Sequence, residues 1–218
     1  MNSVFVRALT SLAAAAILFG LFFAGTTFFV TGLLVCVASI LIFELRPLVG
    51  RLRWWLTVMA GAYSVAGVLC LIWLDLFFRS TSVLIPLYPF LAAATADSAA
   101  YLCGKVFGRH KLAPSISPKK TWEGVAGAFF GIVILHANLV LNSKAALSFF
   151  VSWTGLAVAT VLVTVAAVCG DLFASWIKRK AGVKDYGAIL PGHGGLLDRL
   201  DAVFLVAIAC AAWLVIFV

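Results

Sequence analysis

The sequence has little charge, and most of that charge lies outside long apolar runs. Only 8 of its 218 residues are Asp or Glu and 16 are Lys or Arg, whereas 64% are hydrophobic. A soluble domain is usually about half apolar. The five cysteines form no CxxC pair and are scattered through apolar segments, so we interpret them as small buried hydrophobic residues. The composition therefore predicts a polytopic membrane protein.

The longest stretch without any charge runs from residue 8 to residue 43. Because roughly 20 apolar residues span a bilayer, we expect two helices here, separated near residues 25–27. Further expected spans cover residues 54–74, 82–102, 125–141, 145–177 and 202–218. The sequence thus predicts an all-α bundle of about seven transmembrane helices in a single domain, residues 1–218. Residues 1–90 supply the N-terminal spans, and residues 91–218 form a more polar half that holds the candidate site.

The basic residues alternate from one side of the expected bundle to the other. All of them except Arg79 and Lys144 fall in the N-terminal segment or in residues 44–53, 103–124 and 178–201. Cytoplasmic loops carry an excess of Lys and Arg. We therefore predict a cytoplasmic N-terminus and an extracytoplasmic C-terminus. This asymmetry also explains the net charge of +8 without nucleic acid as a partner.

The most polar part of the chain, residues 170–201, separates the last two expected spans. Asp171, Ser175 and Lys178 are spaced so that they share one face of a helix. Asp198 follows a turn, residues 191–195, whose glycines permit backbone amides to approach an anion closely. Because Mg²⁺ takes carboxylate and phosphate oxygens, Asp171 and Asp198 are candidate metal ligands. The alternative is a helix-end salt bridge, of Asp198 with Arg199 or of Asp171 with Lys178.

A second polar group precedes the fifth expected span. Asp97 lies inside a span, where an ionised carboxylate costs roughly 3 kcal/mol or more unless it is paired or hydrated. It either faces a cavity open to the cytoplasm or bonds a neighbouring helix. Ser117 as a helix cap, with proline next, predicts a helix start that would place backbone N–H groups beside Lys119 and Lys120 as an anion site. The alternative for this segment is a solvated basic loop.

Three polar residues outside these groups have simpler interpretations. We expect His136, in the middle of a span, to be a hydrogen-bonded interior histidine rather than a proton relay. Asp75 and Arg79 are interpreted as polar residues of a short loop. Gly127 and Gly131 form a GxxxG pair, which would let helices approach closely, either within one chain or between the copies of a homodimer.

The C-terminal half contains four motifs: SWIKR at 175–179, KDYG at 184–187, LPGHGG at 190–195 and DRLD at 198–201. In this order and spacing, they resemble the phosphatidate cytidylyltransferase (CDP-diglyceride synthase) family. Asp97 and the run SPKKTWEG at 117–124 resemble the same family. Residue 174 is Ala, where many members have an acidic residue, and the first 90 residues match only in being apolar.

The resemblance implies a reaction between CTP and phosphatidic acid that gives CDP-diacylglycerol and pyrophosphate, in the synthesis of phospholipids. It implies Mg²⁺, in a site of two metal ions whose second ion can be a different cation. It also implies a membrane lipid as substrate, in a bacterial inner membrane, with the active site on the cytoplasmic side. The implied catalytic residues are Asp171 and Asp198 as metal ligands, Ser175 as a further oxygen ligand, and Lys178 and Arg179. The implied substrate-binding residues are Asp97, Lys105, Arg109, Ser117, Lys119, Lys120, Gly192, His193, Gly194, Gly195, Arg199 and Asp201.

Two other functions use some of the same features. A CTP-dependent lipid or polyprenol kinase would bind the same nucleotide but break its bond between the β- and γ-phosphates. A transporter, with Asp97 and His136 as a proton relay, would need a polar path through the whole bilayer. The charged residues instead gather on one side of the expected spans, which argues against a transporter.

Overall fold

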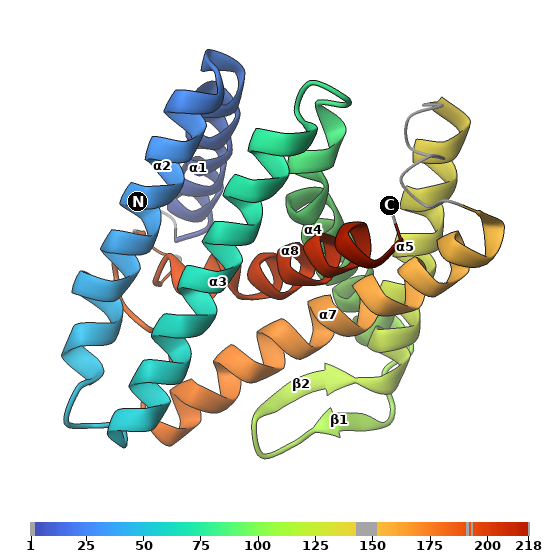
Figure 1. Cartoon of the computed structure of the whole chain (residues 1–218). Coiled ribbons are helices and arrows are strands. Elements are labelled where there is room, and N and C mark those ends of the chain that lie inside the picture. Colours follow the sequence, from blue (N-terminus) through green and yellow to red (C-terminus); the bar gives the residue numbers. More distant parts are fainter. Residues whose placement is uncertain (1–2, 143–151, 191, 193, 218) are drawn as a thin grey trace.

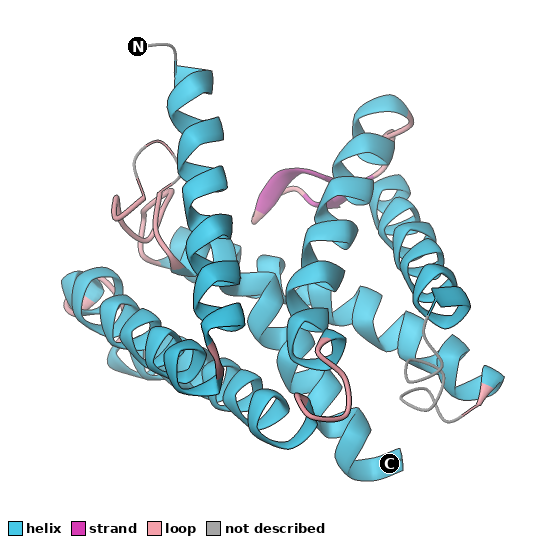
Figure 2. Cartoon of the chain, turned by 90° about the horizontal axis from the view of Figure 1, so that it is seen from above, coloured by secondary structure: helices cyan, strands magenta, loops and turns pink. Residues whose placement is uncertain are grey.

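The protein is a bundle of helices with one small hairpin of strands (Figure 1). The computed structural model describes residues 3–142, 152–190, 192 and 194–217. Figure 2 shows that helices make up nearly all of this described chain. The helices are α1 (Ser3–Ala24), α2 (Thr26–Ser39), α3 (Trp54–Phe78), α4 (Leu84–Val106), α5 (Trp122–Asn142), α7 (Trp153–Lys180) and α8 (Leu197–Phe217). The strands β1 (Lys111–Ala113) and β2 (Ser117–Thr121) pair antiparallel.

The predicted all-α fold is confirmed, whereas the number of membrane spans and their orientation stay predictions. In the described part of the chain, five helical segments are long and apolar enough to cross a membrane. They are Thr26–Leu48, Trp54–Phe78, Trp122–Asn142, Trp153–Lys180 and Leu197–Phe217. The expected break near residue 25 is confirmed, because Gly25 adopts a φ of 125° between α1 and α2. These apolar segments fit an integral membrane protein.

Helix α8 lies at the centre of the bundle and packs against α3, α4 and α7 (Figure 1). It approaches α3 closely, since a Cβ atom on Gly67 would lie 2.4 Å from the Cβ of Phe204. Helix α7 begins at Trp153, where the Ser152 hydroxyl accepts a hydrogen bond from the Gly155 amide at 3.0 Å. The earlier start predicted at residue 145 falls mostly outside the described residues.

Helices α4 and α5 pack through small residues. A Cβ atom on Gly127 would lie 2.5 Å from the Cβ of Cys103, and one on Gly131 would lie 2.7 Å from the Cβ of Ala99. The GxxxG pair therefore serves a contact within one chain. Tyr88 of α4 and His136 of α5 are also joined, by a hydrogen bond of 2.5 Å.

His136 is a hydrogen-bonded interior residue, as the sequence predicted. Its Nδ1 lies 2.8 Å from the Thr160 hydroxyl, which itself donates to the Leu156 carbonyl oxygen at 2.7 Å. Because that hydroxyl has one proton, Nδ1 must be the donor to it, and Nε2 accepts from Tyr88. The bundle interior thus contains a polar chain that links α4, α5 and α7.

The interpretation of Asp75 as a loop residue was wrong, whereas Arg79 lies in the turn that follows α3. Helix α3 continues to Phe78, so Asp75 lies in its last turn and is completely buried. Arg79 donates to Asp75 at 2.7 Å, and its guanidinium lies 4.0 Å from the centroid of the Phe22 ring. The pair fastens the end of α3 to the end of α1, because Arg79 also donates to the Phe22 carbonyl oxygen at 2.7 Å.

Candidate functional site

The last turns of α7 present three predicted site residues on one face, as their spacing required. The Ser175 hydroxyl donates to Asp171 Oδ1 at 3.2 Å. Lys178, one further turn along, reaches out of the helix, and its Nζ lies 2.6 Å from Asp198 Oδ1 at the start of α8. The helix therefore positions an acid near one end of this face and a base near the other.

Asp198 is enclosed by donors on both of its oxygen atoms. While Oδ1 pairs with Lys178, Oδ2 accepts hydrogen bonds of 2.9 Å from the amides of Tyr186 and Gly195. Only 4% of its side chain is exposed. The partner of Lys178 is thus Asp198, across the loop, and the helix-end pair of Lys178 with Asp171 is not what the structure shows. Asp198 holds the loop between α7 and α8 in its folded form.

Tyr186 supports this arrangement from the middle of the loop. Its hydroxyl donates to the Ala174 carbonyl oxygen at 3.0 Å, and its ring lies 5.4 Å from Lys178 Nζ. Burial, together with the nearby negative charge of Asp198, raises the pKa of the Tyr186 hydroxyl well above its usual range. The hydroxyl therefore stays protonated and remains a donor to α7.

The glycine-rich turn fits closely around Asp198. Gly192 and Gly194 adopt φ angles of 76° and 84°, which residues other than glycine rarely adopt. A Cβ atom on Gly194 would also lie 3.2 Å from Asp198 Oδ2. The predicted role of glycine in permitting a close approach is consistent with these contacts, although the group approached here is a carboxylate of the chain itself. His193 lies outside the described residues.

Glu44 belongs to the same region, and sequence reasoning missed it. It is completely buried and accepts hydrogen bonds from the amides of Leu196 and Leu197, the latter at 2.9 Å. It comes from a π-helical turn, Ile40–Leu45, that follows α2. One signal was available in the sequence, because Glu44 is the first charged residue after the charge-free run 8–43.

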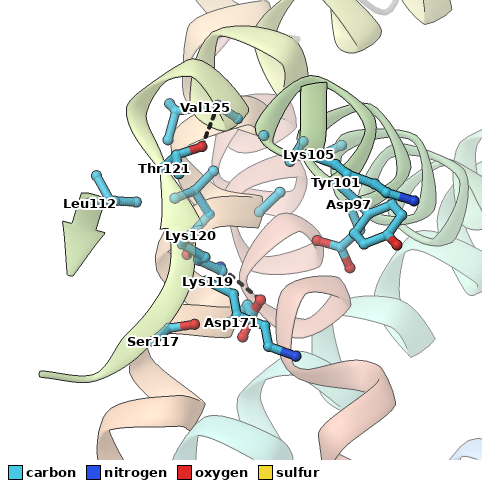
Figure 3. Close-up of a pocket in the computed structure, with 16 residues that line it drawn as sticks. Asp97, Tyr101, Lys105, Leu112, Ser117, Lys119, Lys120, Thr121, Val125 and Asp171 are labelled. Atoms are coloured by element: carbon cyan, nitrogen blue, oxygen red, sulfur yellow. Dashed lines mark hydrogen bonds and ion pairs between the residues drawn. The ribbon is translucent and has the colours of Figure 1, made fainter. Parts of the chain in front are cut away.

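A second group of predicted residues lines a cavity of about 430 Å³ between α4, β2, the start of α5 and α7 (Figure 3). Asp97 and Tyr101 come from α4 on one side, whereas Lys120 and Asp171 come from β2 and α7 on the other. Lys120 Nζ lies 2.7 Å from Asp171 Oδ2. The predicted site residues that line this cavity are Asp97, Lys105, Ser117, Lys119, Lys120 and Asp171.

The helix start predicted at Ser117 was wrong. Residues Ser117–Thr121 form β2, and α5 begins only at Trp122. The strand pairs with β1 through Lys111 and Thr121, and the Thr121 hydroxyl then accepts from the Gly124 amide at 3.1 Å. Thr121 therefore takes the capping role assigned to Ser117. The two lysines line the cavity and lie just before α5, whose first turn lines it as well at Gly124 and Val125.

The remaining predicted residues surround these two groups. Arg179 Nε donates to the Ile116 carbonyl oxygen at 3.1 Å and so ties α7 to the hairpin. Arg109 is exposed just before β1. Asp201 is buried one turn into α8, and its Oδ1 accepts from the Ala202 amide at 2.7 Å. A Cβ atom on Gly170 would lie 2.7 Å from the Asp201 carbonyl oxygen, so α7 and α8 touch here.

Electrostatic interactions join the cavity to the start of α8. The carboxylate of Asp171 is near enough to those of Asp97 and Asp201 to repel both. Lys120 and Arg199 are near enough to Asp97 to offset its negative charge. The site is thus a set of carboxylates, of which Asp171 pairs with Lys120 and Asp198 with Lys178, and Asp171 interacts with both parts.

The residues present suit a cation that arrives with a phosphate better than one held by protein alone. Among the described residues, no three His, Cys, Asp or Glu side chains are grouped as metal ligands. Mg²⁺ usually takes one or two carboxylates and completes its shell with phosphate oxygens and water. Asp171, which lines the cavity next to the Ser175 hydroxyl, fits this pattern. Asp198 is not among the described residues that line this cavity, and its oxygens accept from Lys178 and from the amides of Tyr186 and Gly195.

Comparison with known proteins places the chain in a family. A profile of the cytidylyltransferase family matches residues 9–217. A protein named phosphatidate cytidylyltransferase from Thermotoga maritima is 38% identical over 159 residues, which cover 67% of this chain and 56% of that protein. One of the same name from Mycobacterium bovis is 37% identical over 164 residues, 69% of this chain and 50% of the relative.

A third relative of that name, from Haemophilus influenzae, is 42% identical over 116 residues, which cover 53% of this chain and 40% of the relative. The chain therefore spans about half the length of the curated relatives that it matches. The family profile, in contrast, extends over nearly every residue of the chain, from α1 to the end of α8. On that extent of match, this protein belongs to the cytidylyltransferase family.

Proposed function

We propose that this protein transfers the cytidylyl group of CTP to phosphatidic acid within a membrane. A phosphate oxygen of the lipid attacks the α-phosphorus of CTP, and a new P–O bond forms there. The bond from the α-phosphorus to the β-phosphate oxygen breaks, and pyrophosphate leaves. The products are CDP-diacylglycerol and pyrophosphate, so the lipid phosphate is itself the nucleophile and no nucleophilic side chain is needed.

The observation that carries this proposal is the pairing of acid and base along the cavity. Asp171 pairs with Lys120 there, and Asp97 and Lys119 line the same space. With Lys105, five charged groups of both signs line one cavity, which suits a ligand that carries phosphate and an accompanying cation. The family match and the names of the relatives support a nucleotide triphosphate and a lipid phosphate as the two ligands.

In the proposed mechanism, the lysines bind the phosphates, and the carboxylates that they release become free to hold a metal ion. A phosphate that pairs with Lys120 frees Asp171 Oδ2, and one that pairs with Lys178 frees Asp198 Oδ1. Mg²⁺, when bound, would withdraw electron density from the phosphates, and Asp171 and Asp198, with Ser175, would hold it. Lys119 and Lys105, from β2 and α4, would neutralise the remaining phosphate charge.

The proposed location is the cytoplasmic membrane of a bacterium, with the site on its cytoplasmic side. The distribution of basic residues supports this orientation, because all except Arg79 and Lys144 lie in the segments expected on that side, and these include the loop before α5 and the loop after α7. A position at one end of the apolar helices would let CTP enter from water while the lipid enters from the bilayer.

The test is a transfer assay with purified protein in detergent, phosphatidic acid, Mg²⁺ and CTP labelled at either the α- or the γ-phosphorus. We expect label from the α position in the lipid product and none from the γ position. Label from the γ position would show a kinase instead, and no labelled lipid in either case would refute the proposal. Asp171→Asn should abolish the transfer, whereas Asp75→Asn, a buried carboxylate outside the site, should leave its rate unchanged.

A further inference from the structure

Glu44 connects the N-terminal part of the chain to the loop that carries Asp198. Its carboxylate accepts hydrogen bonds from the amides of Leu196 and Leu197, which lie more than 150 positions later in the sequence. In the described part of the chain, its hydrogen bonds come from main-chain amides alone. These amides belong to the first residue of α8 and to the residue before it, at a helix start where a negative charge interacts favourably with the helix dipole. Glu44 therefore caps α8 from a distant segment.

The backbone conformation around Glu44 directs its side chain toward the interior. The turn Ile40–Leu45 is π-helical, a rare conformation that is found frequently at functional sites. Within this turn, Ile42 and Phe43 are exposed by 50% and 63%, whereas Glu44 is completely buried. Ile42 and Phe43 thus face outward, whereas Glu44 is buried together with Leu45 and contacts the start of α8.

The glycine-rich loop is shaped to Glu44 on one side and to Asp198 on the other. A Cβ atom on Gly195 would lie 2.9 Å from three atoms of the Glu44 carboxylate, and one on Gly187 would lie 3.2 Å from Glu44 Cγ. The amide of the same Gly195 donates to Asp198 Oδ2. One residue of the loop therefore contacts both carboxylates, so a shift of Glu44 moves the main chain that holds Asp198.

From these contacts we infer that Glu44 is a positioning residue for the reaction proposed above. It fixes the turn at residues 194–197 so that Asp198 meets Lys178, and the N-terminal helices thereby complete the site. The inference rests on the proposed function for its effect on catalysis. Its effect on the loop can be measured without any activity, and that measurement keeps the two apart.

The first experiment compares Glu44→Gln with Asp75→Asn. Both replace a completely buried carboxylate in the N-terminal half by its amide, but Asp75 pairs with Arg79 at the far end of α3. In Glu44→Gln the new NH₂ group faces one of the two amides, so one hydrogen bond to a charged acceptor is lost. The loss of such a bond changes the equilibrium constant between the folded and the opened loop by about tenfold.

We expect hydrogen exchange in the segment 185–198 to become about tenfold faster in Glu44→Gln and to stay unchanged in Asp75→Asn. Turnover should fall by about tenfold while the KM for CTP changes by less than about twofold, because the change affects the position of Asp198 and not the cavity. Unchanged exchange in this segment, or an equal change in both variants, would overturn the inference.

A second experiment covers the case in which Glu44→Gln does not fold. Gly195→Ala places a Cβ atom against the Glu44 carboxylate, and Glu44→Asp shortens that side chain and makes room for it. If the two residues act through this contact, the double variant loses less activity and less loop protection than the two single losses together. Additive losses would show that they act independently and would overturn the inference.

A wild-type protein that forms no labelled lipid would refute the proposed reaction but not the positioning role. In that case the exchange measurements alone decide the inference, because they report the loop and not the chemistry. Conversely, full transfer activity combined with normal loop protection in Glu44→Gln would leave the proposed function standing and remove Glu44 from the site.

Discussion

The two lysine–carboxylate pairs of the site differ in burial, and this difference predicts different effects on stability. The side chains of Lys178 and Asp198 are 11% and 4% exposed, whereas those of Lys120 and Asp171 are 23% and 29% exposed. Removing one partner of a buried pair costs roughly 3–5 kcal/mol, because the other charge is left without compensation. A partly exposed pair contributes about 1 kcal/mol or less.

Lys178→Met should therefore destabilise the protein by about 3 kcal/mol, at the low end of that range because two amides still donate to Asp198. Lys120→Met should cost about 1 kcal/mol, since water and the open cavity compensate Asp171. Activity does not separate these variants, because both lysines are expected to bind phosphate. Their free energies of unfolding do, and equilibrium unfolding in mixed micelles with SDS measures them.

A double variant isolates the cause. In Lys178→Met with Asp198→Asn the uncompensated charge is absent, so part of the stability lost in Lys178→Met should return. Equal losses of stability in the two single lysine variants would refute the reasoning from burial. A double variant that is less stable than Lys178→Met would refute the view that an unpaired carboxylate causes the loss.

Two further predictions concern the loop and the bundle interior. Gly194→Ala should lower stability by about 1–2 kcal/mol and reduce transfer, because φ at this position is 84° and the new Cβ atom contacts Asp198. The control is Gly182→Ala, where φ is 67° but the space around the residue is open, so this variant should lose less stability and keep its activity. Tyr88→Phe removes the donor to His136 and should cost about 1 kcal/mol in unfolding free energy without changing turnover, as paired thermal melts and transfer assays would show.

The sequence predicted those features that depend on local pattern. The charge-free run was long enough for two helices, and Gly25 separates them as expected. The spacing of Asp171, Ser175 and Lys178 required a shared face once a helix was present, and α7 provides it. Apolar length and helical periodicity act over neighbouring residues, so they can be recognised without knowledge of the rest of the fold.

The features that sequence reasoning missed depend on contacts between distant segments. Ser117 followed by proline has the local pattern of a helix start, but pairing with β1 draws it into a strand. For Lys178, the sequence offered Asp171 on the same helix as an alternative partner, whereas the loop brings Asp198 to it. In both cases an interaction with a distant segment of the chain is formed in place of the interaction that the neighbouring residues suggest.

The same reasoning explains why motif residues lie in the C-terminal half while the N-terminal helices also shape the site. Tyr63 of α3 donates to the main-chain oxygen of Asp201, and Glu44 receives main-chain amides of Leu196 and Leu197. Such side chains hold the backbone and contact no reacting group, so no reactive residue type or fixed spacing identifies them in a sequence. Because they fix where α8 begins, and α8 carries Asp198, the apolar N-terminal helices determine the geometry of the charged site.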